Sequence, residues 1–241
     1  MKKIVSLILS SALAVSLSAC SGSNTDVANA ETSAQQTQPE NTSEENIPQS
    51  ESSENTAGES SGSNILIAYF TAAENSGVDA ISSASYSVVN GEAVGRLRAV
   101  ANMIQTKTGG ELFSIQTSVV YPTDGGELIE YAADEQANDA RPELTSHIDD
   151  LEQYDVIFVG YPNWWADLPQ VMYSFFDEYD FSGKTIIPFN VHNGSRLSRT
   201  VETIAELEPN AAVETNAFTI SEHNVSDAEK EVTDWLEGLG Y

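Results

Sequence analysis

Apolar positions after residue 64 gather in short runs that polar segments separate. The runs at 64–70 ("NILIAYF"), 155–162 ("DVIFVGYP") and 184–191 ("KTIIPFNV") are apolar almost throughout, whereas 111–117 alternates and 212–220 is weaker. Continuous apolar runs of this length are typical of strands that a parallel sheet buries on both faces. The pattern therefore predicts five strands, three of which are covered on both sides.

Helical spacing fills the segments between these runs. Leu97, Val100 and Ile104 share one face of a predicted helix, which the glycine pair at 109–110 ends. Further helices are predicted within 168–179, 195–209 and 226–240, and one within 123–151. Strands that alternate with helices predict an α/β fold, a doubly wound parallel sheet with helices on both faces.

The first 20 residues have the pattern of a secretion signal. Lys2 and Lys3 precede an apolar stretch that is too short for a comfortable membrane span, and "LSAC" then ends at Cys20. This ending resembles the lipobox of bacterial lipoproteins, in which the cysteine is lipidated. We expect a signal peptide at 1–19 and a lipid anchor on Cys20, at the extracytoplasmic face of a bacterial cell membrane. The alternative is an ordinary signal peptide with an unrelated cysteine.

Residues 20–63 form a predicted tether between the lipid anchor and the folded part. After Cys20 this segment has no aromatic, lysine or arginine residue, eight acidic residues, and Val27 and Ile47 as its only large aliphatics. It has too little apolar surface to offset the entropy cost of ordering, so we expect a disordered acidic linker. The folded domain is then 64–241.

The charge of the domain disfavours two classes of partner. The chain has 37 acidic residues, eight of them in the linker, and ten basic residues that include Lys2 and Lys3, so the domain has a formal charge of −21. Such a charge disfavours nucleic acid and anionic lipid surfaces. Because Cys20 is the only cysteine, a redox role would require a bound cofactor.

Ligands of an open parallel sheet bind outside the carboxyl ends of its strands, where the strand order reverses. Three loops follow such ends here: the one that opens at Thr71, "YPNWWADLP" from residue 161, and "NVHNGSR" from residue 190. We expect the chemistry of the domain to lie in these loops.

Four stretches carry a resemblance to a known family: "ILIAYFT", "TGGELFSIQT", "YDVIFVGYPNWWADLPQ" and "FSGKTIIPFNVHNGSRLSRT". They resemble the flavodoxin-like domains, in particular the bacterial branch with a Tyr-Pro-X-Trp-Trp loop. The resemblance covers about 65–241. It implies a five-stranded parallel sheet of order 2-1-3-4-5, FMN as the cofactor, and a role in electron transfer.

The resemblance also implies which residues hold the flavin. The second loop would pack on its ring and the third would close over the ring's other edge, since aromatic faces and backbone N–H groups suit a flat, electron-poor ring. The residues implied are Pro162, Asn163, Trp164, Trp165, His192, Asn193, Gly194 and Ser195. No residue is assigned a catalytic role, and no spacing indicates a metal site.

The phosphate loop departs from the family pattern of Ser/Thr-X-Thr-Gly-Asn-Thr. Thr71 matches its opening, but residues 72–94 intervene before Gly95, and Arg96 stands where a hydroxyl residue is expected soon after the glycine. The insertion contains Asn90-Gly91, which is a hairpin signal. Either Thr71, Gly95 and Arg96 hold the phosphate at the start of the following helix, or the site is remodelled.

Four arginines are predicted in first helical turns near this edge of the sheet. Arg96 and Arg98 begin one helix, and Arg196 and Arg199 another. Cations there oppose the helix dipole by roughly 0.3–1 kcal/mol, a cost that a bound phosphate would reverse. The alternative is that they are solvated surface arginines.

Three functions remain open at this point. The first is a membrane-tethered FMN electron-transfer protein, which serves a redox partner protein or a small acceptor. The second is an NAD(P)H-dependent FMN oxidoreductase acting on quinones or similar acceptors. The third is a flavin-free binding module on the cell surface, which the altered phosphate loop keeps open.

Overall fold

The computed structural model describes residues 64–75 and 86–241. The predicted signal peptide (1–19), the lipidation site Cys20, the linker (20–63) and residues 76–85 of the insertion lie outside the described residues. Within the part of the chain that is described, no helix has both the length and the apolar character needed to cross a bilayer.

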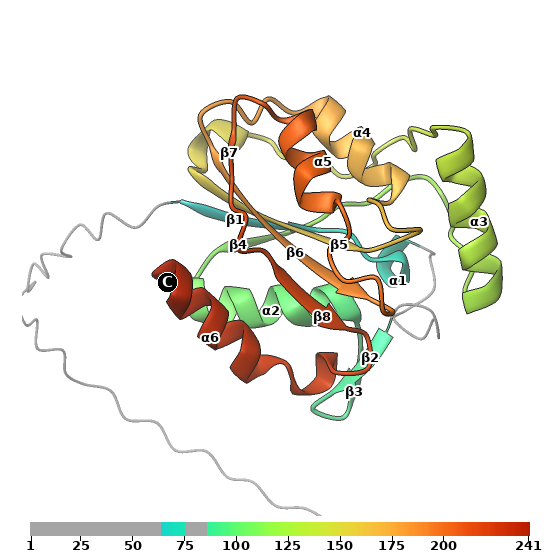
Figure 1. The fold of residues 1–241 in the computed structure, drawn as a ribbon, viewed down its shortest axis with the longest axis horizontal. Coiled ribbons are helices and arrows are strands. Elements are labelled where there is room, and N and C mark those ends of the chain that lie inside the picture. Colours follow the sequence, from blue (N-terminus) through green and yellow to red (C-terminus); the bar gives the residue numbers. More distant parts are fainter. Residues whose placement is uncertain (1–63, 76–85) are drawn as a thin grey trace, which may run out of the picture. The chain divides into compact units, whose positions relative to one another are not determined.

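A parallel sheet organises the domain (Figure 1). Its order is β4-β1-β5-β6, and the last position beside β6 is shared by β7 and β8. Counted by position, this is the order 2-1-3-4-5, so the predicted fold is confirmed. The strands are β1 (Ile65–Tyr69), β4 (Glu111–Ser114), β5 (Val156–Pro162), β6 (Thr185–His192), β7 (Ala212–Val213) and β8 (Phe218–Ser221).

The last position is split where one strand was predicted. β7 pairs with the start of β6 and β8 pairs with its end. Between them the Glu214 carboxylate accepts a 2.7 Å hydrogen bond from the Asn216 backbone N–H, and the Asn216 carbonyl accepts one from the Trp235 indole. The edge strand is interrupted at these residues, where one local bond and one bond from α6 satisfy backbone groups in place of the pairing with β6.

Helices cover both faces of the sheet (Figure 1). α2 and α6 pack on one face, and α4 and α5 pack on the other together with Leu128 of α3. The helices are α1 (Ala72–Asn75), α2 (Arg96–Thr108), α3 (Gly125–Ala137), α4 (Gln170–Glu178), α5 (Thr200–Leu207) and α6 (Glu229–Leu239). Two short 3₁₀ turns lie at Leu151–Gln153 and Val225–Asp227.

The described part of the insertion ends in a β-hairpin, β2 (Tyr86–Val89) and β3 (Glu92–Gly95). Asn90 and Gly91 connect the strands with φ values of 52° and 86°. Two successive positive φ angles match a type I′ turn, which asparagine and glycine adopt readily. The hairpin prediction is confirmed, and β3 leads directly into α2.

The centre of the sheet leaves no room for a side chain at one position of β5. A Cβ atom on Gly160 would lie 2.2 Å from Cζ of Phe189, which is fully buried on the neighbouring strand β6. Glycine at this position therefore allows the Phe189 ring to lie against the backbone of β5.

Gly160→Ala should lower the free energy of unfolding by about 1–3 kcal/mol, because the buried ring of Phe189 must shift. Urea unfolding of the two proteins measures the loss. Gly238→Ala is the matched control: a Cβ there meets no atom within 4 Å, and the residue is exposed in α6. That change should stabilise by up to about 1 kcal/mol. Equal effects of the two changes would contradict the packing argument.

Candidate functional site

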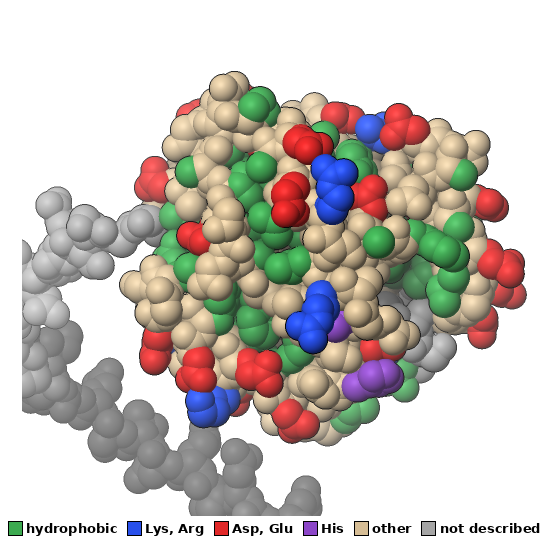
Figure 2. Space-filling model, in the orientation of Figure 1, with side chains coloured by type: hydrophobic (Ala, Val, Ile, Leu, Met, Phe, Trp, Pro, Cys, Tyr) green, Lys and Arg blue, Asp and Glu red, His purple; other side chains and the backbone are tan. Residues whose placement is uncertain are grey.

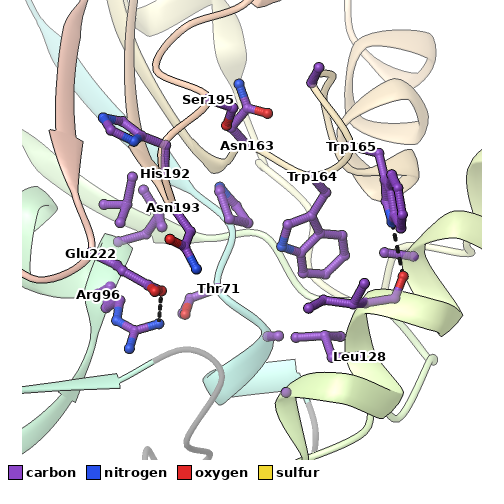
Figure 3. Close-up of a pocket in the computed structure, with 18 residues that line it drawn as sticks. Thr71, Arg96, Leu128, Asn163, Trp164, Trp165, His192, Asn193, Ser195 and Glu222 are labelled. Carbon is purple, nitrogen blue, oxygen red and sulfur yellow. Dashed lines mark hydrogen bonds and ion pairs between the residues drawn. The ribbon is translucent and has the colours of Figure 1, made fainter.

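A cavity of about 490 Å³ lies at the carboxyl ends of the central strands. It takes residues from the ends of β1, β5 and β6 and from the segment that follows β8 (Figure 3). Nine of the eleven residues predicted to bind a cofactor line it: Thr71, Arg96, Pro162, Asn163, Trp164, Trp165, His192, Asn193 and Ser195. The structure thus brings the three predicted loops together, while their role as flavin ligands stays a prediction.

Gly95 and Gly194 are the two predicted residues that do not line the cavity. Gly95 lies behind Thr71, where an added Cβ would approach Oγ1 of Thr71 to 3.0 Å. Gly194 has a φ of 96° and donates its backbone N–H to Nδ1 of His192 at 2.9 Å. Both glycines therefore shape the loops.

Sequence reasoning missed one wall of the cavity and one charged residue. The wall is a stripe of α3 formed by Leu128, Ile129 and Ala132, and the charged residue is Glu222. Glu222 directly follows β8, so the rule that located the other loops also applies to it. For the α3 stripe the sequence held only a weak indication, because Leu128 and Ala132 are an apolar pair four residues apart in a mostly polar segment.

Trp164 forms the aromatic wall of the cavity. Its ring packs edge-on against Phe70 and Tyr121, with ring centroids 5.6 and 5.5 Å away. Both partners are buried, so the indole is held between the core and the cavity. Aromatic pairs prefer this edge-to-face arrangement, which fixes the orientation of the ring.

Trp165 and Ala166 occupy a strained turn. Their φ angles are 52° and 62°, in the left-handed region that costs residues with a Cβ roughly 1–2 kcal/mol each. Trp164 and Asp167 close the turn with backbone hydrogen bonds of 3.1 and 3.0 Å. The Trp165 indole N–H also donates to the Ile129 carbonyl at 2.9 Å, which ties the turn to α3 (Figure 3). Trp165 remains 55% exposed at the rim.

Two asparagines hold the second and third loops together. Nδ2 of Asn163 and Nδ2 of Asn190 each donate a 2.8 Å hydrogen bond to the carbonyl of Arg196. The Asn163 backbone N–H donates to the backbone carbonyl of Val191 at 2.9 Å. One carbonyl thus accepts from the ends of two neighbouring strands, and Arg196 takes a φ of 56° to present it.

The prediction of four arginines in first helical turns at the site is confirmed only in part. Arg96 and Arg98 do lie in the first turn of α2, but of the four only Arg96 lines the cavity. Arg98 is two residues further along α2, about 200° around the helix, and its side chain reaches Tyr69 and Glu74. Arg196 precedes α5, which begins at Thr200, and Arg199 is an exposed residue paired with Glu206.

His192 accepts a hydrogen bond at Nδ1 from Gly194, so its neutral ring carries the proton on Nε2. Burial lowers the pKa of His192, the charge of Arg196 lowers it further, and the Glu222 carboxylate opposes both. The neutral imidazole therefore serves to shape the third loop.

The opposite end of the cavity is polar. Thr71 is 1% exposed, and its Oγ1 has no hydrogen-bond partner among the described residues. Beside it α2 begins at Arg96, with Gly95 as an N-cap that offers no side-chain hydrogen bond. The Arg96 guanidinium forms a 2.8 Å ion pair with Oε2 of Glu222 (Figure 3). This end therefore combines a hydroxyl, a helix start and a cation.

A buried carboxyl lies behind the aromatic wall. Glu135 of α3 is 8% exposed, and the Tyr121 hydroxyl donates to both of its carboxyl oxygens at 3.4 Å. Burial raises the pKa of Glu135 to about 7, and the Tyr121 hydrogen bond only partly opposes this rise. Glu135 titrates near neutral pH next to a residue that contacts Trp164.

The sequence profile of the flavodoxin family matches residues 86–239, which is more than half of the chain. The chain therefore belongs to the flavodoxin family. A search of curated proteins finds no match.

Solved structures have the same fold. One, described as a proposed flavoprotein from Bacteroides eggerthii DSM 20697, is 23% identical with a TM-score of 0.56, and the match covers 74% of this chain and 99% of the other. A second, from Bacteroides uniformis ATCC 8492 and described in the same way, is 24% identical with a TM-score of 0.52, covering 70% and 99%. At these identities the similarity shows the fold alone.

Glu135→Gln should stabilise the protein at pH 8 and have little effect at pH 4.5. The ordinary pKa of the carboxyl is 4.5 and its folded pKa is about 7, so the folded state retains a proton that the unfolded chain has lost. Stability therefore falls as pH rises through this window, and glutamine removes the cost. We expect a gain of about 1–3 kcal/mol at pH 8, measured by urea unfolding.

Glu130→Gln on the exposed side of α3 is the matched control. It should change stability by less than about 0.5 kcal/mol at either pH. A gain for Glu135→Gln that is the same at pH 4.5 and pH 8 would show that ionisation of this carboxyl has no part in it.

Proposed function

We propose that this protein is an extracytoplasmic, membrane-tethered flavoprotein that binds FMN in the cavity and transfers electrons. The observation that supports this most is the division of the cavity into two chemically different halves. One half is aromatic and aliphatic. The other presents, beside the start of α2, the Thr71 hydroxyl, which has no hydrogen-bond partner in the described part of the chain (Figure 3). FMN is divided in the same way, into a flat ring system and a phosphate.

The apolar half suits the ring system. Trp164 supplies a fixed aromatic wall, and Leu128 and Ile129 supply an aliphatic one. The third loop adds the polar residues Asn193 and Ser195 to the lining of the same cavity. A volume of about 490 Å³ lies within the range of roughly 300–1,000 Å³ that is usual for small-molecule sites.

The polar half suits a phosphate. The buried Oγ1 of Thr71 is a donor without a partner among the described residues, and a phosphate oxygen would satisfy it. The first backbone N–H groups of α2 have no intrahelical acceptors, and Arg96 adds a cation. These groups compensate for the hydroxyl residues that the family pattern leads us to expect.

Bound FMN would supply reversible transfer of one or two electrons. The protein's own part is to shield the ring from water and to set its electrostatic surroundings. Acidic side chains are spread over the face in Figure 2, where basic side chains are few, and the domain has a formal charge of −21. Negative charge opposes the addition of electrons, so this environment favours a low reduction potential.

The location and the partner belong to the same proposal. The "LSAC" ending at Cys20 supports a lipid anchor, and the acidic segment up to residue 63 supports a tether that holds the domain away from the membrane. The exposed rim residues Trp165 and Ile129 would give a redox partner protein or a small acceptor access to the ring edge.

The test uses the processed chain, expressed from residue 20 with Cys20→Ser so that no lipid is attached. FMN should bind with quenching of its fluorescence, and the isolated protein should show flavin absorbance. Steady-state oxidation of NAD(P)H with a quinone would instead assign the oxidoreductase activity. A colourless protein that leaves FMN fluorescence unchanged would exclude flavin binding and leave the surface binding module.

The two adjacent tryptophans should contribute unequally to FMN binding. Trp164 is anchored against Phe70 and Tyr121, so Trp164→Ala removes a fixed wall and should weaken binding about 10–100-fold. Trp165 lies exposed at the rim, and Trp165→Ala should weaken binding less than about fivefold. Fluorescence titration measures both values, and urea unfolding confirms that the variants are folded.

Trp235→Ala is the control for this pair. Trp235 packs in the cluster on the opposite face of the sheet and does not line the cavity, so FMN affinity should be unchanged. Equal and negligible losses for Trp164 and Trp165 would show that the pair has another role.

A further inference from the structure

We propose that Glu222 is a specificity residue that weakens the binding of phosphate-bearing flavins by competing for Arg96. This inference rests on the proposed function, and it concerns the polar half of the same cavity. Riboflavin is the counterpart of FMN without the phosphate. The other groups at this end favour the affinity for FMN over that for riboflavin, and Glu222 reduces this difference in affinity.

The position of Glu222 is set by the sheet. The strand β8 pairs with β6 up to Ser221 and His192, and the next backbone N–H, that of Glu222, donates to the His192 carbonyl at 2.9 Å. This bond fixes the backbone of Glu222 at the carboxyl edge of the sheet. Its side chain lines the cavity opposite the start of α2.

The carboxylate lies where an anionic ligand would be recognised. Oε2 of Glu222 is 2.8 Å from a guanidinium nitrogen of Arg96, and the two side chains are only 19% and 16% exposed. Its other oxygen is 3.8 Å from Nε2 of His223, a ring that is 75% exposed. Arg96 is the only lysine or arginine among the described residues lining the cavity, and a carboxylate already compensates its charge.

A second, independent observation indicates that a ligand belongs at this end. Thr71 is 1% exposed, lines the cavity, and presents an Oγ1 without a partner among the described residues. Glu222 compensates Arg96 but does not hydrogen-bond Thr71. A phosphate bound here would therefore accept hydrogen bonds from the Thr71 hydroxyl and from the start of α2. It would, however, have to share Arg96 with Glu222 or displace Glu222 from it.

Charge decides the outcome of this competition. A phosphate monoester carries −1.5 to −2 charges near neutral pH, and a carboxylate a few ångströms away repels it in a partly desolvated site. Riboflavin has the same ring and no phosphate, so it does not meet this repulsion. The effect of Glu222 is thus selective for the phosphate-bearing ligand.

The experiment compares FMN and riboflavin on the processed chain with Cys20→Ser, by quenching of the fluorescence of their common ring. Glu222→Gln keeps the size of the side chain and removes its charge. We expect it to tighten FMN binding about tenfold and to change riboflavin binding less than about twofold. Thr71→Val should weaken FMN binding about fivefold or more and leave riboflavin binding nearly unchanged.

Glu237→Gln is the matched control. Glu237 forms an ion pair of the same length, 2.8 Å, with Lys107 in the last turn of the same helix α2, away from the cavity. It removes one negative charge from the protein, so it accounts for any general effect of net charge. Neither flavin should change its affinity for this variant by more than about twofold.

The outcomes separate this inference from the proposed function. If Glu222→Gln leaves the ratio of FMN to riboflavin affinity unchanged, or tightens both flavins equally, Glu222 is not the specificity residue, although flavin binding stands. If no variant quenches either flavin, the proposed function fails and this inference fails with it. Selective tightening of FMN supports both.

Discussion

Parallel pairing of β1 with β4 on one side and with β5 on the other is the constraint on which the rest of the structure depends. Parallel strands point the same way, so all their carboxyl ends lie at one edge of the sheet. Helices must cover both faces, because β1, β5 and β6 are buried on both sides. The chain segments that follow β1 and its neighbour β5 therefore leave the sheet toward opposite faces, so the loops at the carboxyl ends of these two strands diverge. The cavity lies between these diverging loops.

The loops at that edge are held by hydrogen bonds that offset local strain. The positive φ angles of Trp165, Ala166 and Arg196 are unfavourable for residues with side chains. They persist because an indole N–H bonds α3 and because two asparagine amides converge on the Arg196 carbonyl. Rigid loops lose little entropy when a ligand binds, so the strain is consistent with a preformed site.

The charges at the site differ from those on the rest of the surface, because a cation paired with a carboxylate lies at the cavity of an otherwise acidic protein. An acidic protein would be expected to repel a phosphate. Arg96, the one lysine or arginine among the described residues that line the cavity, is itself compensated by Glu222. On the proposed function, affinity for an anion would then depend on hydrogen-bond donors near that pair, above all Thr71. On this proposal, the balance between one carboxylate and one buried hydroxyl would set which flavin the cavity prefers.

The local pattern of the sequence was sufficient for β1, β4, β5, β6 and the Asn90-Gly91 hairpin, because side-chain period and turn chemistry act over a few residues. It was also sufficient to find the loops after β1, β5 and β6. It did not show that the last strand is split into β7 and β8 or that α5 begins only at Thr200. Only the tertiary structure decided that α3 and Glu222 complete the cavity and that Arg98 and Arg199 turn away from it. These outcomes depend on where a helix face or an edge strand comes to rest against segments far along the chain. Many weak nonlocal contacts set that position, and no short stretch of sequence encodes it.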